Sequence, residues 1–262
     1  MLQLKQVQPR VFVATSTLYK TNTIIIQGAG HRCLVVDPGV TVQEIATLTR
    51  EIALWGYRVD AGFSTHPHWD HLLWSKEWKQ APRFAARACV EVAQAQRSAL
   101  VEELTREAPG HPLELFASLS PLPEGSHELF WHGPAARVLT HNGHAPGHSA
   151  LFFPDLGLLL AGDMVSDVEV PLLDLRASNP IRDYRDGLKM LANLAGVRMV
   201  IPGHGHIADA NEYRRRLNAD RQYLADLENM RESADPRLTA AWLHQQHREQ
   251  VEWVRSRNSP TP

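Results

Sequence analysis

Short apolar runs rich in β-branched residues alternate with turn-forming residues near the start of the chain. Val11 to Thr15, Thr23 to Gln27 and Cys33 to Val36 have the length and composition of strands, with glycine and proline between or after them. Because such runs are separated by short turns, we predict an antiparallel meander at the start of the fold.

A helix is predicted directly after this meander. Thr41 and Glu44 have the capping-box spacing, and apolar residues follow at helical intervals from Ile45 to Trp55. The next strand is expected at Ala61 to Thr65. Residues 85–120 are rich in Ala, Glu and Leu, and we predict that this stretch is helical.

The second half of the chain repeats the alternation of strands and helices. Strands are expected at Arg137 to Thr140, Ala150 to Phe153, Leu158 to Leu160 and Val197 to Ile201. A helix is expected at Asp183 to Leu194, and a helical tail is expected through about residue 257. Since no internal linker interrupts the pattern, we expect one α+β domain, with a core at 1–207 and a helical C-terminal extension at 208–262.

Composition and charge narrow the class of protein. Hydrophobic residues make up 44% of the 262 residues and charged residues 21%, which is typical of an ordinary globular chain. The 27 basic and 29 acidic side chains give a net charge of −2, which argues against broad nucleic-acid binding. We find neither a membrane-spanning apolar run nor a secretory leader, so we expect no membrane partner and a cytoplasmic location.

The unusual feature of the composition is its 14 histidines. His66, His68, Asp70 and His71 fall within six residues, directly after a predicted strand. Imidazole and carboxylate are the ligands that zinc prefers, and burying so many polar groups without a partner would be costly. On an extended backbone His66 and His68 point to the same side, so both could reach one metal ion.

Three further candidate ligands lie at turns beside predicted strands. They are His148 in a Pro-Gly-His sequence, Asp163 in Gly-Asp and His204 in Gly-His-Gly. A single catalytic zinc needs three protein ligands. Seven candidates therefore indicate either two metal ions or some residues with another role.

In this ordered set of motifs the sequence resembles the metallo-β-lactamase superfamily of hydrolases. The motifs are Asp37-Pro38-Gly39, His-Pro-His-Trp-Asp-His at 66–71, Pro-Gly-His at 146–148, Gly-Asp at 162–163 and Gly-His-Gly at 203–205. The resemblance implies a four-layer αββα sandwich. It also implies His66, His68 and His148 on one metal ion, Asp70, His71 and His204 on a second, and Asp163 as the bridge between them.

The resemblance also implies a reaction. The bridging Asp163 makes the chain similar to esterase, thioesterase and lactonase branches such as hydroxyacylglutathione hydrolase. It implies two Zn²⁺ ions, with Fe or Mn as other options, and a metal-held hydroxide that attacks a small ester, thioester or lactone. Asp70 is the candidate catalytic residue, orienting that hydroxide or carrying its proton. The alternatives are a mononuclear iron enzyme similar to persulfide dioxygenases, a phosphodiesterase or nuclease of the same superfamily, and a metal-binding scaffold without turnover.

Other residues have two possible roles in the sequence. Asp37 either supports the site through a hydrogen bond or caps its own turn. His141, His144 and His206 lie close to the motifs but outside the matched ligand positions, so we expect loop or supporting roles for them. Trp69 and Trp74 either line the pocket mouth or pack in the core, and Ser166 is a further residue that could contact substrate.

Overall fold

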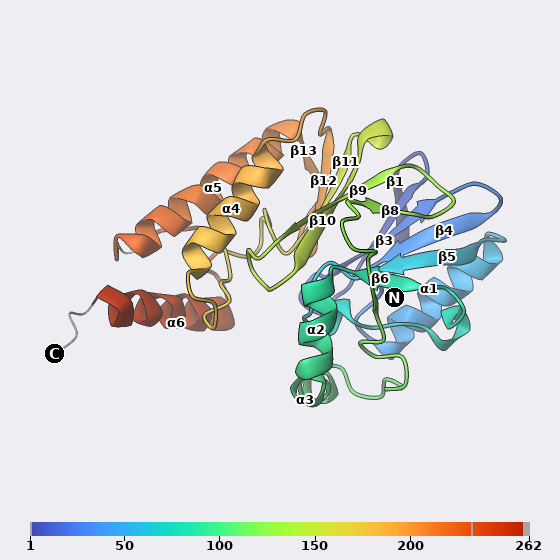
Figure 1. Ribbon diagram of the computed structural model, residues 1–262, viewed down its shortest axis with the longest axis horizontal. Coiled ribbons are helices and arrows are strands. Elements are labelled where there is room, and N and C mark those ends of the chain that lie inside the picture. Colours follow the sequence, from blue (N-terminus) through green and yellow to red (C-terminus); the bar gives the residue numbers. More distant parts are fainter. Residues whose placement is uncertain (1, 232, 259–262) are drawn as a thin grey trace.

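Two mixed β-sheets form the centre of the computed structural model, which describes residues 2–231 and 233–258 (Figure 1). The first sheet contains, in spatial order, β1 (Leu4–Gln8), β2 (Val11–Thr15), β3 (Asn22–Gln27), β4 (Arg32–Val36), β5 (Arg58–Phe63), β6 (Arg83–Ala85) and β7 (Ser120–Pro121). The second contains β13 (Ala208–Asp209), β12 (Met199–Pro202), β11 (Leu158–Gly162), β10 (His148–Phe153), β9 (Ala136–His141) and β8 (Glu128–Leu129). The predicted antiparallel meander is confirmed, since β1 to β4 pair antiparallel in chain order.

Helices lie outside the two sheets, on their outer faces and beyond their edges (Figure 1). They are α1 (Val42–Leu54), α2 (Arg87–Ala95), α3 (Arg97–Glu107), α4 (Pro180–Ala192), α5 (Ala210–Glu228) and α6 (Ala241–Asn258). Leu48 and Ile52 of α1 are buried with Ile25 of β3 on one side. Leu188 of α4 and Leu217 of α5 are buried in one cluster with strand residues of the second sheet.

The core between the sheets follows from the strand period. Ile24 and Ile26 of β3 belong to the cluster that joins both sheets, while Ile25 faces α1. Successive strand side chains point to opposite faces, so a strand that is apolar at every position is covered on both sides. This arrangement confirms the expected α+β sandwich of four layers.

The predicted N-terminus of α1 is confirmed in detail. The backbone N–H of Glu44 donates to Thr41 Oγ1 at 3.2 Å, and the N–H of Thr41 donates to Glu44 Oε2 at 3.0 Å. Each side chain therefore satisfies a helix-end donor that would otherwise lack a partner.

The prediction of continuous helix was wrong over residues 85–120. The helices there end at Glu107, and residues 108–119 form irregular chain that leads to β7. The helical tail is also interrupted, between Glu228 and Ala241. Helix propensity is a weak prior, and the contacts of Arg83 with the carbonyl oxygens of Leu115 and Ser118 stabilise the irregular segment instead.

The helical extension packs on the same core as the sheets. Residues 208–209 form β13, which pairs with β12, and α5 follows directly after it. Residues 259–262 of the predicted extension lie outside the described residues. Within the described chain, no helix is long and apolar enough to cross a membrane.

Candidate metal centre

The predicted ligands are mounted on loops at one end of the two sheets. His66 to His71 follow β5, Asp163 directly follows β11, and His204 follows β12. The loop between β9 and β10 adds His144. Loops that begin at strand ends can converge on one point while the sheets stay rigid, which suits a site that needs fixed geometry.

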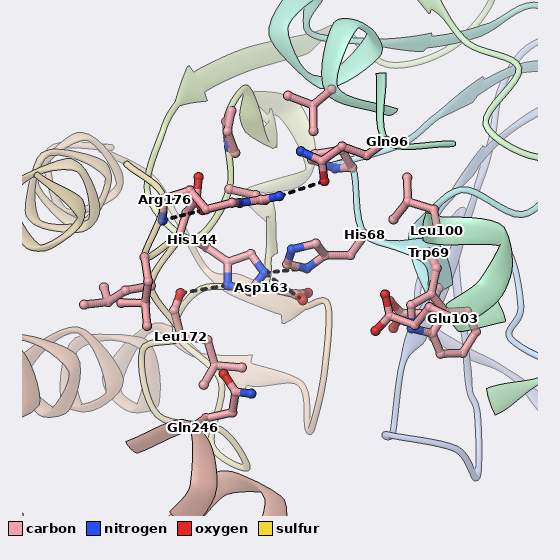
Figure 2. Close-up of a pocket in the computed structure, with 18 of the residues that line it drawn as sticks. His68, Trp69, Gln96, Leu100, Glu103, His144, Asp163, Leu172, Arg176 and Gln246 are labelled. Atoms are coloured by element: carbon pink, nitrogen blue, oxygen red, sulfur yellow. Dashed lines mark hydrogen bonds and ion pairs between the residues drawn. The ribbon is translucent and has the colours of Figure 1, made fainter. Parts of the chain in front are cut away.

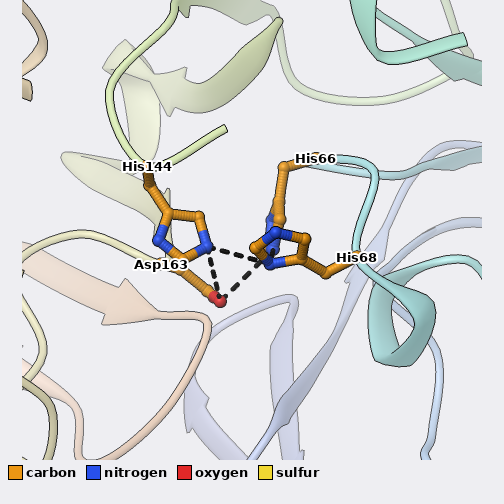
Figure 3. A group of neighbouring side chains, drawn as sticks. All are labelled: His66, His68, His144 and Asp163. Carbon is orange, nitrogen blue, oxygen red and sulfur yellow. Dashed lines mark hydrogen bonds and ion pairs between the residues drawn. The ribbon is translucent and has the colours of Figure 1, made fainter. Parts of the chain in front are cut away.

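Four side chains form the first group, which we define as His66, His68, His144 and Asp163 (Figure 3). His68 Nδ1 lies 3.1 Å from His66 Nε2 and 3.0 Å from His144 Nε2. Asp163 Oδ2 lies 3.3 Å from His66 Nε2 and 3.4 Å from His144 Nε2. Donor atoms of a tetrahedral zinc site are separated by about 3.3 Å, so these spacings suit a metal ion at the centre.

Asp70, His71 and His204 form the second group. His71 Nε2 and His204 Nε2 lie 3.2 Å apart, and each lies 3.4 Å from Asp70 Oδ2. Asp163 joins the two groups, because its Oδ1 lies 3.4 Å from His71 Nε2 and its Oδ2 lies 3.2 Å from His204 Nε2. One carboxylate therefore faces both sets of donors.

Neighbouring carbonyl and carboxylate oxygens determine the tautomer of three histidines in the two groups. His144 Nδ1 lies 3.1 Å from Leu172 O, and His204 Nδ1 lies 2.9 Å from Tyr19 O. A carbonyl oxygen only accepts, so Nδ1 must carry a hydrogen, and in the neutral imidazole that binds a metal ion Nε2 then has the lone pair. His71 Nδ1 lies 3.0 Å from Asp37 Oδ2, which favours the same tautomer.

Asp37 also orients His66, through Thr65. The Thr65 hydroxyl donates to Asp37 Oδ2 at 2.7 Å, and its oxygen lies 3.0 Å from His66 Nδ1. Because the single hydroxyl hydrogen is used, the threonine oxygen accepts from Nδ1–H and leaves the His66 Nε2 lone pair free. Of the two roles expected for Asp37, the structure supports the one in which its carboxylate orients the site.

His148 lies outside both groups, although the sequence pattern predicts it as a ligand. Its Nε2 accepts a hydrogen bond from the backbone N–H of Asp163 at 3.0 Å. Gly162 makes this approach possible, since a Cβ there would lie 2.4 Å from that nitrogen. The structure instead places His144 among the donors, a residue that we expected to be an ordinary loop histidine. The chain has two Gly-His pairs four residues apart, and only the tertiary contacts distinguish them.

The charge state of the groups is strongly perturbed. Burial lowers the pKa of His66 to about 4. Burial also acts to lower the pKa of His204, but the carboxylates of Asp163 and Glu169 outweigh it and raise that pKa to about 10. Burial opposes ionisation of Asp70 and Asp163, yet the histidines hold both pKa values below the ordinary aspartate value. The closely packed carboxylates depend on positive neighbours to stabilise their charges, and a bound cation can take that role.

The residues present fit metal ions. Asp163 Oδ1 is buried and accepts no hydrogen bond from the described residues, although a buried carboxylate oxygen is costly to leave without a partner. Together with the five imidazole nitrogens of the two groups, this oxygen forms a donor set suited to divalent metals such as zinc.

Glu169 is an acidic residue of the site that the sequence pattern did not reveal. It groups with Asp163 and His204, and its Oε1 lies 3.8 Å from His204 Nδ1. Burial raises the pKa of its carboxyl to about 7. The six-residue Ser166 to Pro171 loop has no metal-ligand spacing, so only the fold brings Glu169 to the site.

The remaining residues singled out from the sequence have varied roles. Ser166 Oγ donates to His204 O at 2.9 Å, so it stabilises the loop behind the ligands. His206 is exposed and its Nδ1 lies 2.8 Å from Asp167. Trp74 packs against Gly62 in the core, whereas Trp69 belongs to another core cluster and also lines the cleft described next.

The groups open into a cleft of ≈ 630 Å³ (Figure 2). Its lining includes His68, Asp70, His144, Asp163 and His204. Side chains of α2, α3 and α6 and the chain from Glu169 to Arg176 contribute its walls. A cleft of this size accommodates a small molecule.

Comparison with known proteins agrees with this fold. A metallo-beta-lactamase family protein from Thermus thermophilus is 25% identical, with 86% of this chain and 83% of that chain covered and a TM-score of 0.66. A beta-lactamase domain protein from Burkholderia ambifaria is 20% identical, with coverages of 96% and 87% and a TM-score of 0.69. The sec-alkylsulfatase Pisa1 from Pseudomonas sp. shares the fold at 14% identity, with coverages of 88% and 42% and a TM-score of 0.69. No curated protein matches the chain.

The family model for the metallo-beta-lactamase superfamily matches residues 16–222, which include every residue of both groups. That match, the four-layer sandwich and the paired His/Asp groups agree, and the chain belongs to the metallo-β-lactamase superfamily.

Proposed function

We propose that this protein is a metal-dependent hydrolase that holds two divalent metal ions, Zn²⁺ first among them. The observation that carries the proposal is that two groups of buried donor atoms share the carboxylate of Asp163. His66, His68 and His144 would hold one ion, and Asp70, His71 and His204 the other. When bound, such a pair of ions lowers the pKa of a shared water and polarises the bond to be cleaved.

Asp70 is the proposed catalytic residue among these side chains. Its Oδ2 accepts a hydrogen bond from Thr21 Oγ1 at 3.1 Å and faces His71 and His204. The threonine fixes the carboxylate rotamer, so its oxygens are directed at the space between the groups. From there Asp70 would orient a water molecule and hold the proton that this water loses.

The proposed substrate is a small ester, thioester or lactone. Leu100, Leu172 and Leu173 line the cleft and provide apolar contacts for an acyl group or an alcohol. The fold by itself does not select a substrate, since Pisa1 is described as an alkylsulfatase and has the same fold. We propose a small-molecule substrate in the cytoplasm, with neither nucleic acid nor membrane as partner.

Metal analysis combined with hydrolysis assays tests the proposal. We expect two zinc ions per chain, hydrolysis of a panel of esters, thioesters and lactones, and no oxygen consumption. Asp163→Ala should lower both metal content and turnover. The exposed His206→Ala is the matched control and should change neither.

Other outcomes would support other reactions. One iron per chain with thiol-dependent oxygen uptake would refute hydrolysis and favour the dioxygenase. Cleavage of phosphodiesters alone would favour a nuclease. Full metal content with an inert panel would favour a binding scaffold.

A further inference from the structure

Three aromatic side chains and one carboxylate line the cleft beside the second group. Tyr19 follows β2, Trp69 begins the turn before Asp70, Trp242 lies on α6 and Glu103 lies on α3. Figure 2 shows Trp69 and Glu103 together at one side of the cleft. We call these four residues, Tyr19, Trp69, Glu103 and Trp242, the aromatic corner.

The Tyr19 ring of the aromatic corner stands nearly perpendicular to each of the two tryptophan rings. The Tyr19 ring centroid lies 6.2 Å from that of Trp69, at an interplanar angle of 75°. It also lies 6.2 Å from the centroid of Trp242, at 81°. Rings at such angles present both faces and edges to a shared space, and aromatic faces carry partial negative charge that attracts cations.

Tyr19 is held in place through its side-chain hydroxyl and through its backbone carbonyl group. Its hydroxyl donates to Glu107 Oε2 at 2.8 Å, and its carbonyl oxygen lies 2.9 Å from His204 Nδ1. The second contact ties the aromatic corner directly to a residue of the second group. A molecule bound in the corner therefore lies next to the proposed reacting centre.

Glu103 is the charged residue of the cleft that has no counter-charge in contact with it. Among the described residues it makes no hydrogen bond or ion pair, and burial raises the pKa of its carboxyl. Arg106, one turn further along α3, is paired with Glu107 at 2.9 Å. Arg176, the cation that lines the cleft, contacts Asp174 Oδ1 at 3.0 Å and Gln96 Oε1 at 2.8 Å.

We propose that the aromatic corner binds an alkylammonium group of the substrate, with Glu103 as its counter-charge and Tyr19, Trp69 and Trp242 around it. The inference rests on the proposed function, because the bond to be hydrolysed would lie at the two groups while the ammonium group occupies the corner. The favoured substrate is then an ester or thioester with a cationic end, rather than an anionic one.

A pair of isosteric thioesters tests this inference. Acetylthiocholine has a trimethylammonium group where S-(3,3-dimethylbutyl) thioacetate has a neutral tert-butyl group. In each, water adds to the acyl carbon, the C–S bond breaks, and acetate, the thiol and one proton are released. Because cation–π and carboxylate contacts act on the cation alone, we expect kcat/KM to be roughly tenfold higher for acetylthiocholine.

Two variants link this preference to the aromatic corner. Glu103→Gln and Trp242→Leu should each reduce the ratio of the two kcat/KM values toward one. Glu102→Gln is the matched control, since Glu102 is exposed on the same helix and does not line the cleft. It should leave the ratio unchanged.

Calorimetric binding of choline to the metal-loaded protein separates the two proposals. Choline binding that weakens in Glu103→Gln but not in Glu102→Gln supports the aromatic corner, even when no thioester is hydrolysed. In that case the proposed hydrolysis fails and the binding site stands. Hydrolysis of both thioesters at equal kcat/KM, or an absence of choline binding, overturns the aromatic corner.

Discussion

The choice between His144 and His148 gives the sharpest test of the metal centre. We predict that His144→Ala lowers metal binding, because its Nε2 lies 3.0 Å from His68 Nδ1 and 3.4 Å from Asp163 Oδ2. The first group would lose one of four donors. Since changes to residues that merely orient ligands cost about 10–100-fold in affinity, loss of a ligand should cost about 100-fold or more.

His148→Ala should behave differently. Its Nε2 accepts from the buried Asp163 N–H, and its ring stacks on those of His66 and His141, with centroids 5.2 and 4.7 Å away. An unpaired buried N–H costs about 1–3 kcal/mol, and loss of the stacked ring adds to this cost. For a chain of this size such a loss lowers Tm by roughly 5 °C or more. Two metal ions should remain.

Both variants are measured in the same way, by elemental analysis after dialysis against a weak chelator and by thermal unfolding of the same samples. His144→Ala is expected to keep about one ion, and His148→Ala to keep two ions with a lower Tm. If His148→Ala drops to one ion while His144→Ala keeps two, the tautomer argument is refuted and the sequence-based ligand set is correct.

Three further predictions concern the shared carboxylate and its support. Asp37→Asn should weaken metal binding by about 10–100-fold in a chelator competition, because His71 loses its carboxylate partner; unchanged affinity would contradict that role. Gly203→Ala should abolish hydrolysis while circular dichroism stays native, since a Cβ there would lie 1.9 Å from Asp163 Oδ1; wild-type turnover would show that the carboxylate can move. Removal of metal with a strong chelator should lower Tm, because each bound ion adds about 4 kcal/mol of stability when metal is at 1,000 times its Kd, and added zinc should restore the Tm. A Tm that does not respond to chelator would argue against buried metal ions.

Local features of the chain were predictable because they depend on neighbours in sequence. The meander from β1 to β4 follows from runs of β-branched residues with turns between them, and the start of α1 follows from the Thr41 and Glu44 capping box. The dense motif from His66 to His71 identifies a metal site for the same reason, since its ligands are held together by the chain itself. The prediction of continuous helix over residues 85–120 was wrong because long-range contacts of Arg83 with Leu115 and Ser118 outweigh helix propensity there.

The sequence by itself therefore determined the sandwich, and it predicted a metal site from most of the residues that the two groups contain. Only the tertiary structure distinguished His144 from His148. The backbone N–H of Asp163 donates to the lone pair of His148 Nε2, whereas His144 Nε2 faces the other donors of the first group. It also brought Glu169 and the aromatic corner to the cleft from distant segments. A metal ligand is defined by a lone pair directed at a point in space, and residue spacing does not specify that direction when two histidines share one loop.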